Sequence, residues 1–389
     1  MKPFTMFHKT YYVTALFMSV GMIYPNPHTD RARITFIIFL IVTSLPLCFT
    51  MLLDIYNSWL RYDILNIIRH STVLGPFLGG FFKMLLMFTK RVKAGELIKE
   101  FNRDLSLYND LSAPYKNAAR ASIRNSNIYS ERCWLIAIAS CVSLFPLMAI
   151  CQMLYSVKDV PTKYMIHDTN KPFSKDLDAR FESPYFEFMF VYSLFYSMWY
   201  IINFVGYDGF FGLCMNHACL KMKIYCMMLE DAFKLDNISD VRRAIVKVID
   251  EQIRTYKFIG NAQETFNEWL GLIFVATIIQ ICTCMYQVTE GYSLDVRYMI
   301  FMIVSVAHIY VPCRYAAKLK DTSVRTAVDF YCSGWEDLND QSTRKMIMFM
   351  MARAQIPIIM SAFKMIDFDM KLFVSMLQSS YSMFALLKS

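Results

Sequence analysis

Few residues of the chain have the types and spacing that support chemistry. Cys282-x-Cys284 has the spacing of a metal-binding pair, but its apolar run offers no His or carboxylate beside it. We interpret the pair as small packing residues. The chain has no glycine-rich phosphate loop, no HExxH motif and no nucleophile elbow. We therefore expect no enzyme activity, no metal, no cofactor and no nucleic-acid binding.

Polar residues interrupt several apolar stretches. His308 lies inside one, where an ionisable group is either functional or a neutral histidine bonded to a neighbouring helix. Lys83 lies near the end of another, and we expect its ammonium group to extend to the membrane surface. Serines recur near one helical face of the tail, at Ser375, Ser379, Ser382 and Ser389.

Long uncharged runs indicate a membrane protein. Of the 389 residues, 56% are hydrophobic and only 19% are charged, against about 25% charged in soluble domains. A spanning helix needs about 20 apolar residues. Four runs meet this need: Ile34 to Leu53, Cys133 to Val157, Phe188 to Tyr207 and Trp269 to Thr289. Three weaker ones are Ser71 to Phe88, Tyr298 to Cys313 and Leu372 to Leu387. The sequence predicts an all-α protein with seven transmembrane helices.

The distribution of Lys and Arg predicts the orientation of these helices. Both residue types are far more numerous in the N-terminus and in every second connection than on the opposite side. Because positive charge stays in the cytoplasm, the N-terminus is predicted to be cytoplasmic and the C-terminus extracellular. A G-protein-coupled receptor has the reverse orientation.

The cytoplasmic connections are predicted to be helical extensions. From Glu230 to Glu268 apolar residues recur at helical spacing among charges, which is typical of an amphipathic helix. The fourth span is expected to continue past Tyr207, and the sixth to continue to Trp335. These extensions either pack within one chain or form a subunit-assembly domain, and the pattern leaves both readings open.

An ordered set of residues marks the C-terminal region. The set is Tyr331-Cys332, Trp335, Arg344-Lys345, Gln355-x-Pro357, Phe363, Phe373, Tyr381-Ser382 and Leu386-Leu387. It resembles the C-terminal region of insect odorant receptors. Gustatory receptors have a different C-terminal pattern, in which a Gln-Phe pair follows the tyrosine. No Gln-Phe pair follows Tyr381 here. The odorant co-receptor is longer between the fourth and fifth spans, so the chain looks like a tuning, ligand-binding subunit.

This resemblance implies a function and partners. The family forms odorant-gated cation channels, in which a tuning subunit and the co-receptor form a tetramer around a central pore. The expected partners are therefore the co-receptor, a small volatile odorant, permeant cations and the lipid bilayer. The expected location is the plasma membrane of olfactory sensory neurons. A gustatory-type channel subunit and a G-protein-coupled receptor are the alternatives.

The resemblance also implies a division of the chain. Residues 1–313 would form the first six spans and the ligand pocket, 314–371 the cytoplasmic anchor helices, and 372–389 the pore-lining helix. The helix before the pore would run from Arg344 to Phe363, and Lys364 to Lys371 would be a break. The expected subunit-anchor residues are Tyr331, Trp335, Arg344, Gln355, Pro357 and Phe363.

Two sets of functional residues follow from the resemblance. In the tail, Leu386 would be a hydrophobic gate, and Ser379, Ser382 and Ser389 would line the pore. For Ser375 and Ser379 close helix packing is the stronger reading. Transferred by depth in the membrane, the ligand-binding residues would be Ser71, Leu74, Met148, Gln152, Tyr192, Tyr196, Phe301, Val304, Ser305 and His308. Such a mostly apolar pocket suits a small volatile molecule.

Overall fold

Helices make up nearly all of the described structure. The computed structural model describes residues 3–155, 163–174, 176, 178–290 and 296–388. Within these residues, six helical segments are long and apolar enough to cross a membrane: Pro27–Leu60, Ile64–Thr89, Ala113–Tyr155, Tyr185–Ala232, Ile238–Glu290 and Val296–Asp337. The expected all-α membrane fold is confirmed. The tail helix, the expected seventh span, is not among these six, and its crossing of the membrane stays a prediction.

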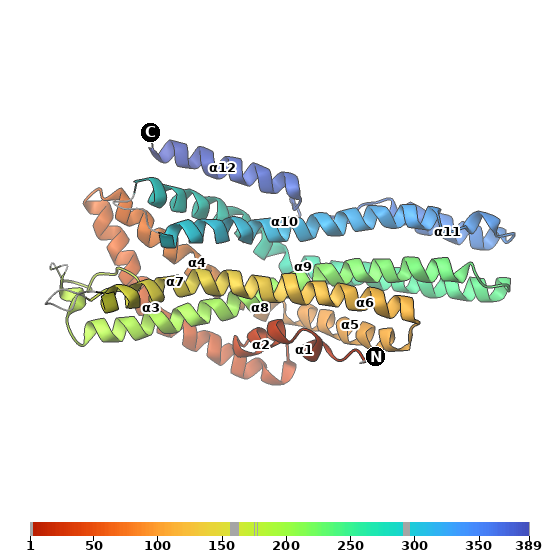
Figure 1. Cartoon of the computed structure of the whole chain (residues 1–389), viewed down its shortest axis with the longest axis horizontal. Coiled ribbons are helices and arrows are strands. Elements are labelled where there is room, and N and C mark those ends of the chain that lie inside the picture. Colours follow the sequence, from red (N-terminus) through yellow and green to blue (C-terminus); the bar gives the residue numbers. More distant parts are fainter. Residues whose placement is uncertain (1–2, 156–162, 175, 177, 291–295, 389) are drawn as a thin grey trace.

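The helices follow one another along the chain (Figure 1), and the longest connection lies between α7 and α8. The first half contains α1 (Phe7–Thr10), α2 (Tyr12–Val20), α3 (Asp30–Leu60), α4 (Ile64–Thr89), α5 (Arg91–Asp110), α6 (Ala113–Ser126) and α7 (Trp134–Tyr155). The second half contains α8 (Tyr185–Ala232), α9 (Ile238–Glu290), α10 (Val296–Tyr331), α11 (Gln341–Ala354), β1 (Ser361–Ala362), β2 (Ile366–Asp367) and α12 (Met370–Lys388). A π-helical segment, Asn127–Cys133, joins α6 to α7. Short 3-10 turns lie at Pro27–Thr29, Asp178–Phe181 and Trp335–Asp337.

Two helices are much longer than a bilayer is thick. The helix α8 has 48 residues and α9 has 53. At 1.5 Å per residue they extend over about 70 to 80 Å, whereas the hydrocarbon core is about 30 Å thick. They therefore continue beyond the membrane, as the sequence predicts for the fourth span. The predicted helix from Glu230 to Glu268 is interrupted, because α8 ends at Ala232 and α9 begins at Ile238.

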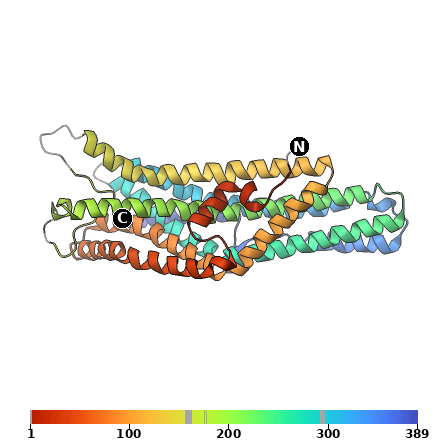
Figure 2. The same ribbon diagram turned by 90° about the horizontal axis from the view of Figure 1, so that it is seen from below.

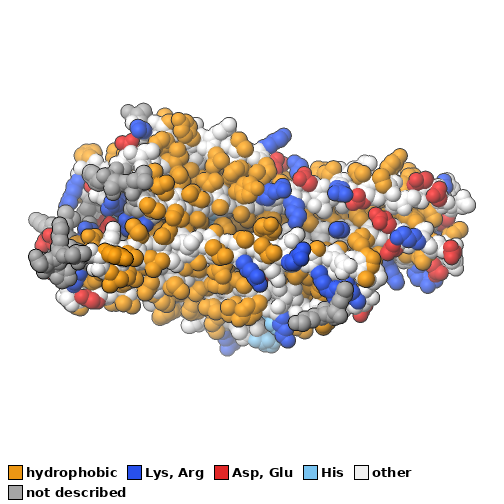
Figure 3. All heavy atoms as spheres, in the orientation of Figure 1, with side chains coloured by type: hydrophobic (Ala, Val, Ile, Leu, Met, Phe, Trp, Pro, Cys, Tyr) orange, Lys and Arg blue, Asp and Glu red, His pale blue; other side chains and the backbone are white. Residues whose placement is uncertain are grey.

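The surface divides into an apolar part and a charged part. Figure 3 shows hydrophobic side chains covering the wider part of the molecule, while acidic and basic side chains gather on the narrow end formed by the helical extensions. Exposed apolar residues of the wider part include Phe39, Val42 and Leu45 on α3, and Val191 and Phe195 on α8. So large an apolar surface is stable only where lipid or another subunit covers it.

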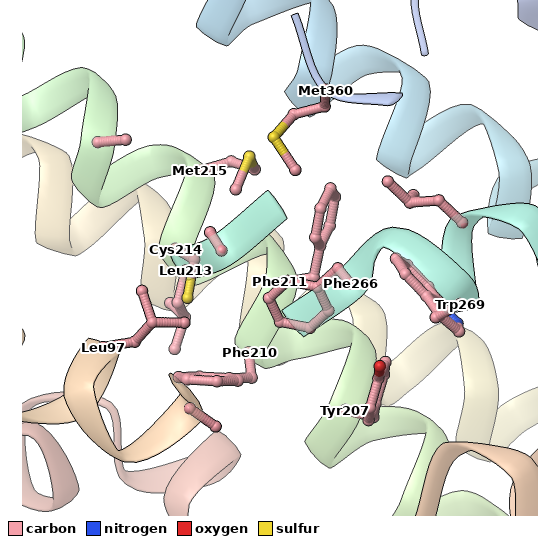
Figure 4. Close-up of a cluster of buried hydrophobic side chains, with 14 of the residues drawn as sticks. Leu97, Tyr207, Phe210, Phe211, Leu213, Cys214, Met215, Phe266, Trp269 and Met360 are labelled. Carbon is pink, nitrogen blue, oxygen red and sulfur yellow. The ribbon is translucent and has the colours of Figure 1, made fainter. Parts of the chain in front are cut away.

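Aromatic side chains fill the core where the long helices meet. Figure 4 shows Tyr207, Phe210 and Phe211 of α8 beside Phe266 and Trp269 of α9. The ring centroids of Phe211 and Phe266 lie 5.1 Å apart, and those of Phe211 and Trp269 lie 5.2 Å apart. All five side chains are almost fully buried. This cluster fixes how α8 packs against α9.

The N-terminal segment packs against the middle of α8 (Figure 2). Two glycines of α8 permit this close approach. A Cβ atom at Gly206 would lie 3.1 Å from the backbone nitrogen of Met18, and one at Gly209 would lie 3.0 Å from Oγ1 of Thr14. Larger residues at either position would push α2 away from α8. The segment before the first span is therefore part of the folded core.

A buried charge network joins α5 to α8 in the helical extension. Oδ2 of Asp104 lies 2.9 Å from Nε2 of His217 and 2.5 Å from Nζ of Lys221. Burial alone would raise the pKa of Asp104, but the His217 hydrogen bond and the Lys221 charge outweigh it, so the pKa of this carboxyl lies below its ordinary value. The carboxylate is therefore ionised and acts as a fixed link between the two helices.

The segment before the tail differs from the predicted helix of residues 344–363. The helix α11 ends at Ala354, and residues 361–367 form a small hairpin of β1 and β2. The reason is Pro357, which has no N–H group and disfavours helical geometry in the residue before it. Gln263 of α9 anchors the hairpin, because its amide exchanges hydrogen bonds of 2.6 and 3.0 Å with the backbone of Ser361.

Removing one ring from the aromatic cluster tests its contribution to the fold. Phe266→Ala leaves a cavity between α8 and α9, and it should lower the free energy of unfolding by about 3 to 5 kcal/mol. Thermal unfolding of the purified protein in detergent measures the loss. Ile253→Ala, at a side chain of the same helix that is 59% exposed, is the matched control. Equal stability of the two variants would contradict the role of the cluster.

Candidate functional site

A cavity of about 460 Å³ lies among the membrane helices α4, α7, α8, α9 and α10. Two glycines on α4, which have no side chain, help to open it. A Cβ atom at Gly79 would meet nothing within 4 Å, and one at Gly75 would meet only the amide oxygen of Gln280, at 3.9 Å. The volume falls within the range of about 300 to 1,000 Å³ that is usual for small-molecule sites.

The cavity wall is mostly apolar, with polar groups at a few points. Its aromatic surface comes from Phe82, Tyr200, Phe204, Trp269 and Phe301. The polar groups that line it are Ser71, Lys83, Thr277, Gln280, Thr283, Ser305 and His308. Some of these groups already have a hydrogen-bond partner in their own helix. The Ser305 hydroxyl, for example, donates to the Phe301 carbonyl at 2.7 Å. The arrangement suits a small, mainly apolar ligand with one polar group.

A second, smaller cavity of about 70 Å³ adjoins the first. The two share Pro76, Tyr200 and Phe301 as lining residues. Tyr196 and His167 also line the smaller cavity, and His167 belongs to the connection between α7 and α8. Burial lowers the pKa of His167 to about 4, so its ring is neutral at neutral pH. The smaller cavity is therefore an uncharged continuation of the larger one.

A buried ion pair lies at one end of the larger cavity. Nζ of Lys83 on α4 lies 2.7 and 2.8 Å from the two carboxylate oxygens of Asp208 on α8. Nε2 of His308 on α10 lies 3.2 Å from Oδ2 of the same carboxylate. Lys83 is only 2% exposed. The prediction that Lys83 extends to the membrane surface is therefore wrong, because Asp208 provides a partner inside the protein.

The structure brings half of the predicted ligand residues to the larger cavity. These are Ser71, Phe301, Val304, Ser305 and His308. Tyr196 lines the smaller cavity, together with Phe301. His308 lines the cavity and also bonds Asp208 of a neighbouring helix, and its functional role stays a prediction.

The other predicted ligand residues line neither cavity. Leu74 is buried in helix packing, and Gln152 is exposed on α7. Met148 is partly exposed on the same helix. The Tyr192 hydroxyl donates to the Thr43 carbonyl of α3. The prediction places these residues by depth alone, and the rotation of each helix directs them elsewhere.

Sequence reasoning missed the contribution of α9 to the wall. Ile273, Ala276, Thr277 and Gln280 of this helix line the larger cavity. Gln280 carried a usable signal, because an amide inside an apolar run must find a polar partner or a cavity. Its amide nitrogen lies 3.4 Å from Sγ of Cys284. Cys282 and Cys284 are both buried in packing, and the described residues contain no cluster suited to a metal ion.

The tail helix α12 packs chiefly against α9 and α10. Met376, Ser380 and Phe384 form its buried face. Ser379, Ser382 and Leu386 are exposed, and Leu386 is 76% exposed. Ser389 lies outside the described residues. The predicted pore residues with described positions therefore share the face that points away from the rest of the chain.

The predicted subunit-anchor residues are mostly at the surface of the extension. Tyr331, Gln355, Pro357 and Phe363 are exposed, whereas Trp335 and Arg344 are partly buried. Nη2 of Arg344 donates to the Glu336 carbonyl at 2.7 Å. Neighbouring apolar side chains are also exposed, including Phe349 at 75% and Ile356 at 60%. This part of the molecule thus presents apolar surface outside the membrane region.

Comparison with known proteins identifies the family. Residues 63–381 match the family model described as 7tm Odorant receptor. The chain belongs to the odorant receptor family. Odorant receptor 85b of Drosophila melanogaster is 21% identical over 402 residues, covering 97% of both chains. Odorant receptor 10 of Aedes albopictus is 20% identical over 358 residues, covering 90% of both.

Solved structures agree with this odorant receptor fold. The olfactory receptor OR5 from Machilis hrabei matches with a TM-score of 0.77 and 16% identity, covering 97% of this chain and 99% of that one. Its complex with eugenol matches with a TM-score of 0.76 and 15% identity, at the same coverage. The predicted resemblance is confirmed, and the chain is a multi-pass membrane receptor and not an enzyme.

The buried ion pair can be tested by removing one partner. Lys83→Met leaves Asp208 without its main counter-charge in an apolar surround, and it should destabilise the receptor by about 3 to 5 kcal/mol. The double variant Lys83→Met with Asp208→Asn removes both charges and should recover part of that loss. Thermal unfolding of the purified receptor measures Lys83→Met, Asp208→Asn and the double variant. A double variant that loses the full sum of the single effects would show that the charges do not interact.

Proposed function

We propose that this chain is the odorant-binding subunit of a ligand-gated cation channel. The observation that carries the proposal is the mostly apolar cavity of about 460 Å³ that lies among the membrane helices of a chain in this family. Its size and lining suit a small volatile molecule. The related receptor from Machilis hrabei, solved in complex with eugenol, supports a ligand of similar size.

The subunit is proposed to work in a tetramer with the odorant co-receptor, in the plasma membrane of olfactory sensory neurons. Exposed apolar residues outside the membrane region support an assembly surface there. They include Tyr331, Phe349, Ile356 and Phe363. In this proposal the cytoplasmic extension, residues 314–371 included, makes most of the subunit contacts, with Trp335, Arg344, Gln355 and Pro357 among the anchor residues.

The tail helix is proposed to line the central pore. Its outward face carries Ser379, Ser382 and Leu386, and their positions share one side of the helix. A ring of leucines from several subunits would exclude water and so block ions. A small outward movement of the α12 helices would let ions pass. The contact between Tyr310 of α10 and Phe373 of α12, with ring centroids 5.4 Å apart, offers a path from the cavity wall to this helix.

Recording currents from cells that express the chain tests the proposed function. Whole-cell currents evoked by a panel of volatile compounds should require both this chain and the co-receptor, and they should persist when G-protein signalling is blocked. Phe301→Ala should shift the half-maximal ligand concentration by about tenfold or more, because Phe301 lines both cavities. Phe39→Ala, at a 54% exposed ring on α3, should not. Responses that need G-protein signalling, or equal behaviour of the two variants, would contradict the proposal.

The proposed gate has a test of its own. Leu386→Ser should raise the current that flows without ligand, because a hydroxyl group keeps water in the constriction. Leu387→Ser changes the same residue type one position away, which turns the hydroxyl about 100° around the helix. That control should leave the resting current low. If Leu386→Ser also leaves resting current and gating unchanged, the gate lies elsewhere.

A further inference from the structure

The polar end of the larger cavity has its hydrogen-bond donors already occupied. Two N–H groups of the Lys83 ammonium are directed at the two oxygens of Asp208, at 2.7 and 2.8 Å. The same nitrogen lies 3.3 Å from the centroid of the Phe204 ring, so the rest of the ammonium group is held against the ring face by a cation–π contact. The Lys83 side chain is only 3% exposed. A ligand in the cavity therefore finds no spare donor on this lysine.

The contact with Asp208 also determines the tautomer of His308. A carboxylate that receives two N–H groups from an ammonium is ionised and can only accept hydrogen bonds. Nε2 of His308, 3.2 Å from Oδ2 of Asp208, must therefore carry a proton and donate it. A second proton on the ring would place two cations beside one carboxylate in an apolar region, which is unfavourable. The ring is thus neutral, with its proton on Nε2.

The other ring nitrogen is left as an acceptor. Nδ1 of His308 receives no hydrogen bond from any residue in the described ranges. The ring is held in place, since it stacks on Trp134 with centroids 5.8 Å apart and planes 11° apart. Phe204 covers it as well, with centroids 5.4 Å apart. His308 lines the cavity and its side chain is 18% exposed.

We propose that the receptor selects ligands that carry a hydroxyl group, aliphatic alcohols or phenols, whose O–H donates a hydrogen bond to Nδ1 of His308. This inference rests on the proposed function, because it takes the larger cavity as the odorant site. The apolar body of the ligand lies among Tyr200, Ile273 and Phe301. Ethers, esters and ketones of the same size have only acceptors, so they leave Nδ1 without a partner.

Isomeric pairs of compounds test the ligand class. Octanol and heptyl methyl ether have the same atoms, as do para-propylphenol and para-ethylanisole, but only the first of each pair can donate. In cells expressing the chain with its co-receptor, the hydroxyl compounds should act at concentrations at least about tenfold lower than their isomers. Octanone, an acceptor of similar size, should resemble the ethers. Equal potency within both pairs, or a preference for the ether or ketone, overturns the inference.

A variant locates the selectivity at His308. His308→Phe keeps an aromatic ring between Trp134 and Phe204 but removes the acceptor, so alcohol and ether should become about equally potent. His28→Phe makes the same replacement at an exposed histidine and should preserve the preference. The level of the receptor–co-receptor complex at the cell surface, measured for both variants, reports folding. A full alcohol preference in a well-expressed His308→Phe receptor would assign the selectivity to another group.

A binding measurement separates this inference from the proposed channel function. Octanol should raise the thermal unfolding temperature of the purified full-length receptor more than heptyl methyl ether does at the same concentration. Equal shifts, or no shift with either compound, overturn the ligand class even where currents are recorded. A larger shift with octanol in a receptor that passes no current with its co-receptor supports the ligand class and contradicts the channel function.

Discussion

The pairing of Lys83 with Asp208 is the interaction on which the arrangement of the membrane helices depends. Either charge alone would be strongly unfavourable among apolar side chains, so α4 and α8 must meet where the two charges meet. His308 brings α10 to the same carboxylate. Three helices are therefore joined at one point, and the end of the larger cavity is fixed at that point.

The fixed charges give the cavity one rigid end, while the rest of its wall is mostly apolar and less constrained. On α4 the glycines at 75 and 79 leave open space, and the facing surface of α9 consists largely of aliphatic side chains such as Ile273 and Ala276. Apolar contacts impose little direction, so this part of the wall accepts ligands of different outline. Discrimination between compounds of equal size comes from the polar groups of the wall, where hydrogen bonds have direction, and the ion-pair end fixes one of these groups, His308, most firmly.

The sequence predicts the broad architecture well because that architecture follows from local patterns. Uncharged runs mark the spans, and the ordered residues from Tyr331 to Leu387 mark the family. The ion pair could not be predicted in this way. Lys83 and Asp208 are 125 residues apart, and each stands near the end of an apolar run. From the sequence alone, each charge is therefore expected to reach water at the membrane surface.

The candidate site shows the same limit at the level of single residues. Depth in the membrane could be transferred from the family, and for Phe301, Ser305 and His308 it leads to the cavity. Rotation about the helix axis could not be transferred. The helix α7 is apolar on all sides, so no pattern distinguishes its inward face, and Met148 and Gln152 point away from the cavity.

The position of α12 connects the cavity to the proposed pore in mechanical terms. This helix packs chiefly on α9 and α10, and both of these helices line the cavity. Lys388 bonds Glu290 at 2.9 Å, which attaches the last turn of α12 to the end of α9. Tyr310 and Phe373 join its first turn to α10. In the proposed channel, a ligand that changes the spacing of α9 and α10 would move the surface on which α12 packs, because both of these helices contact it.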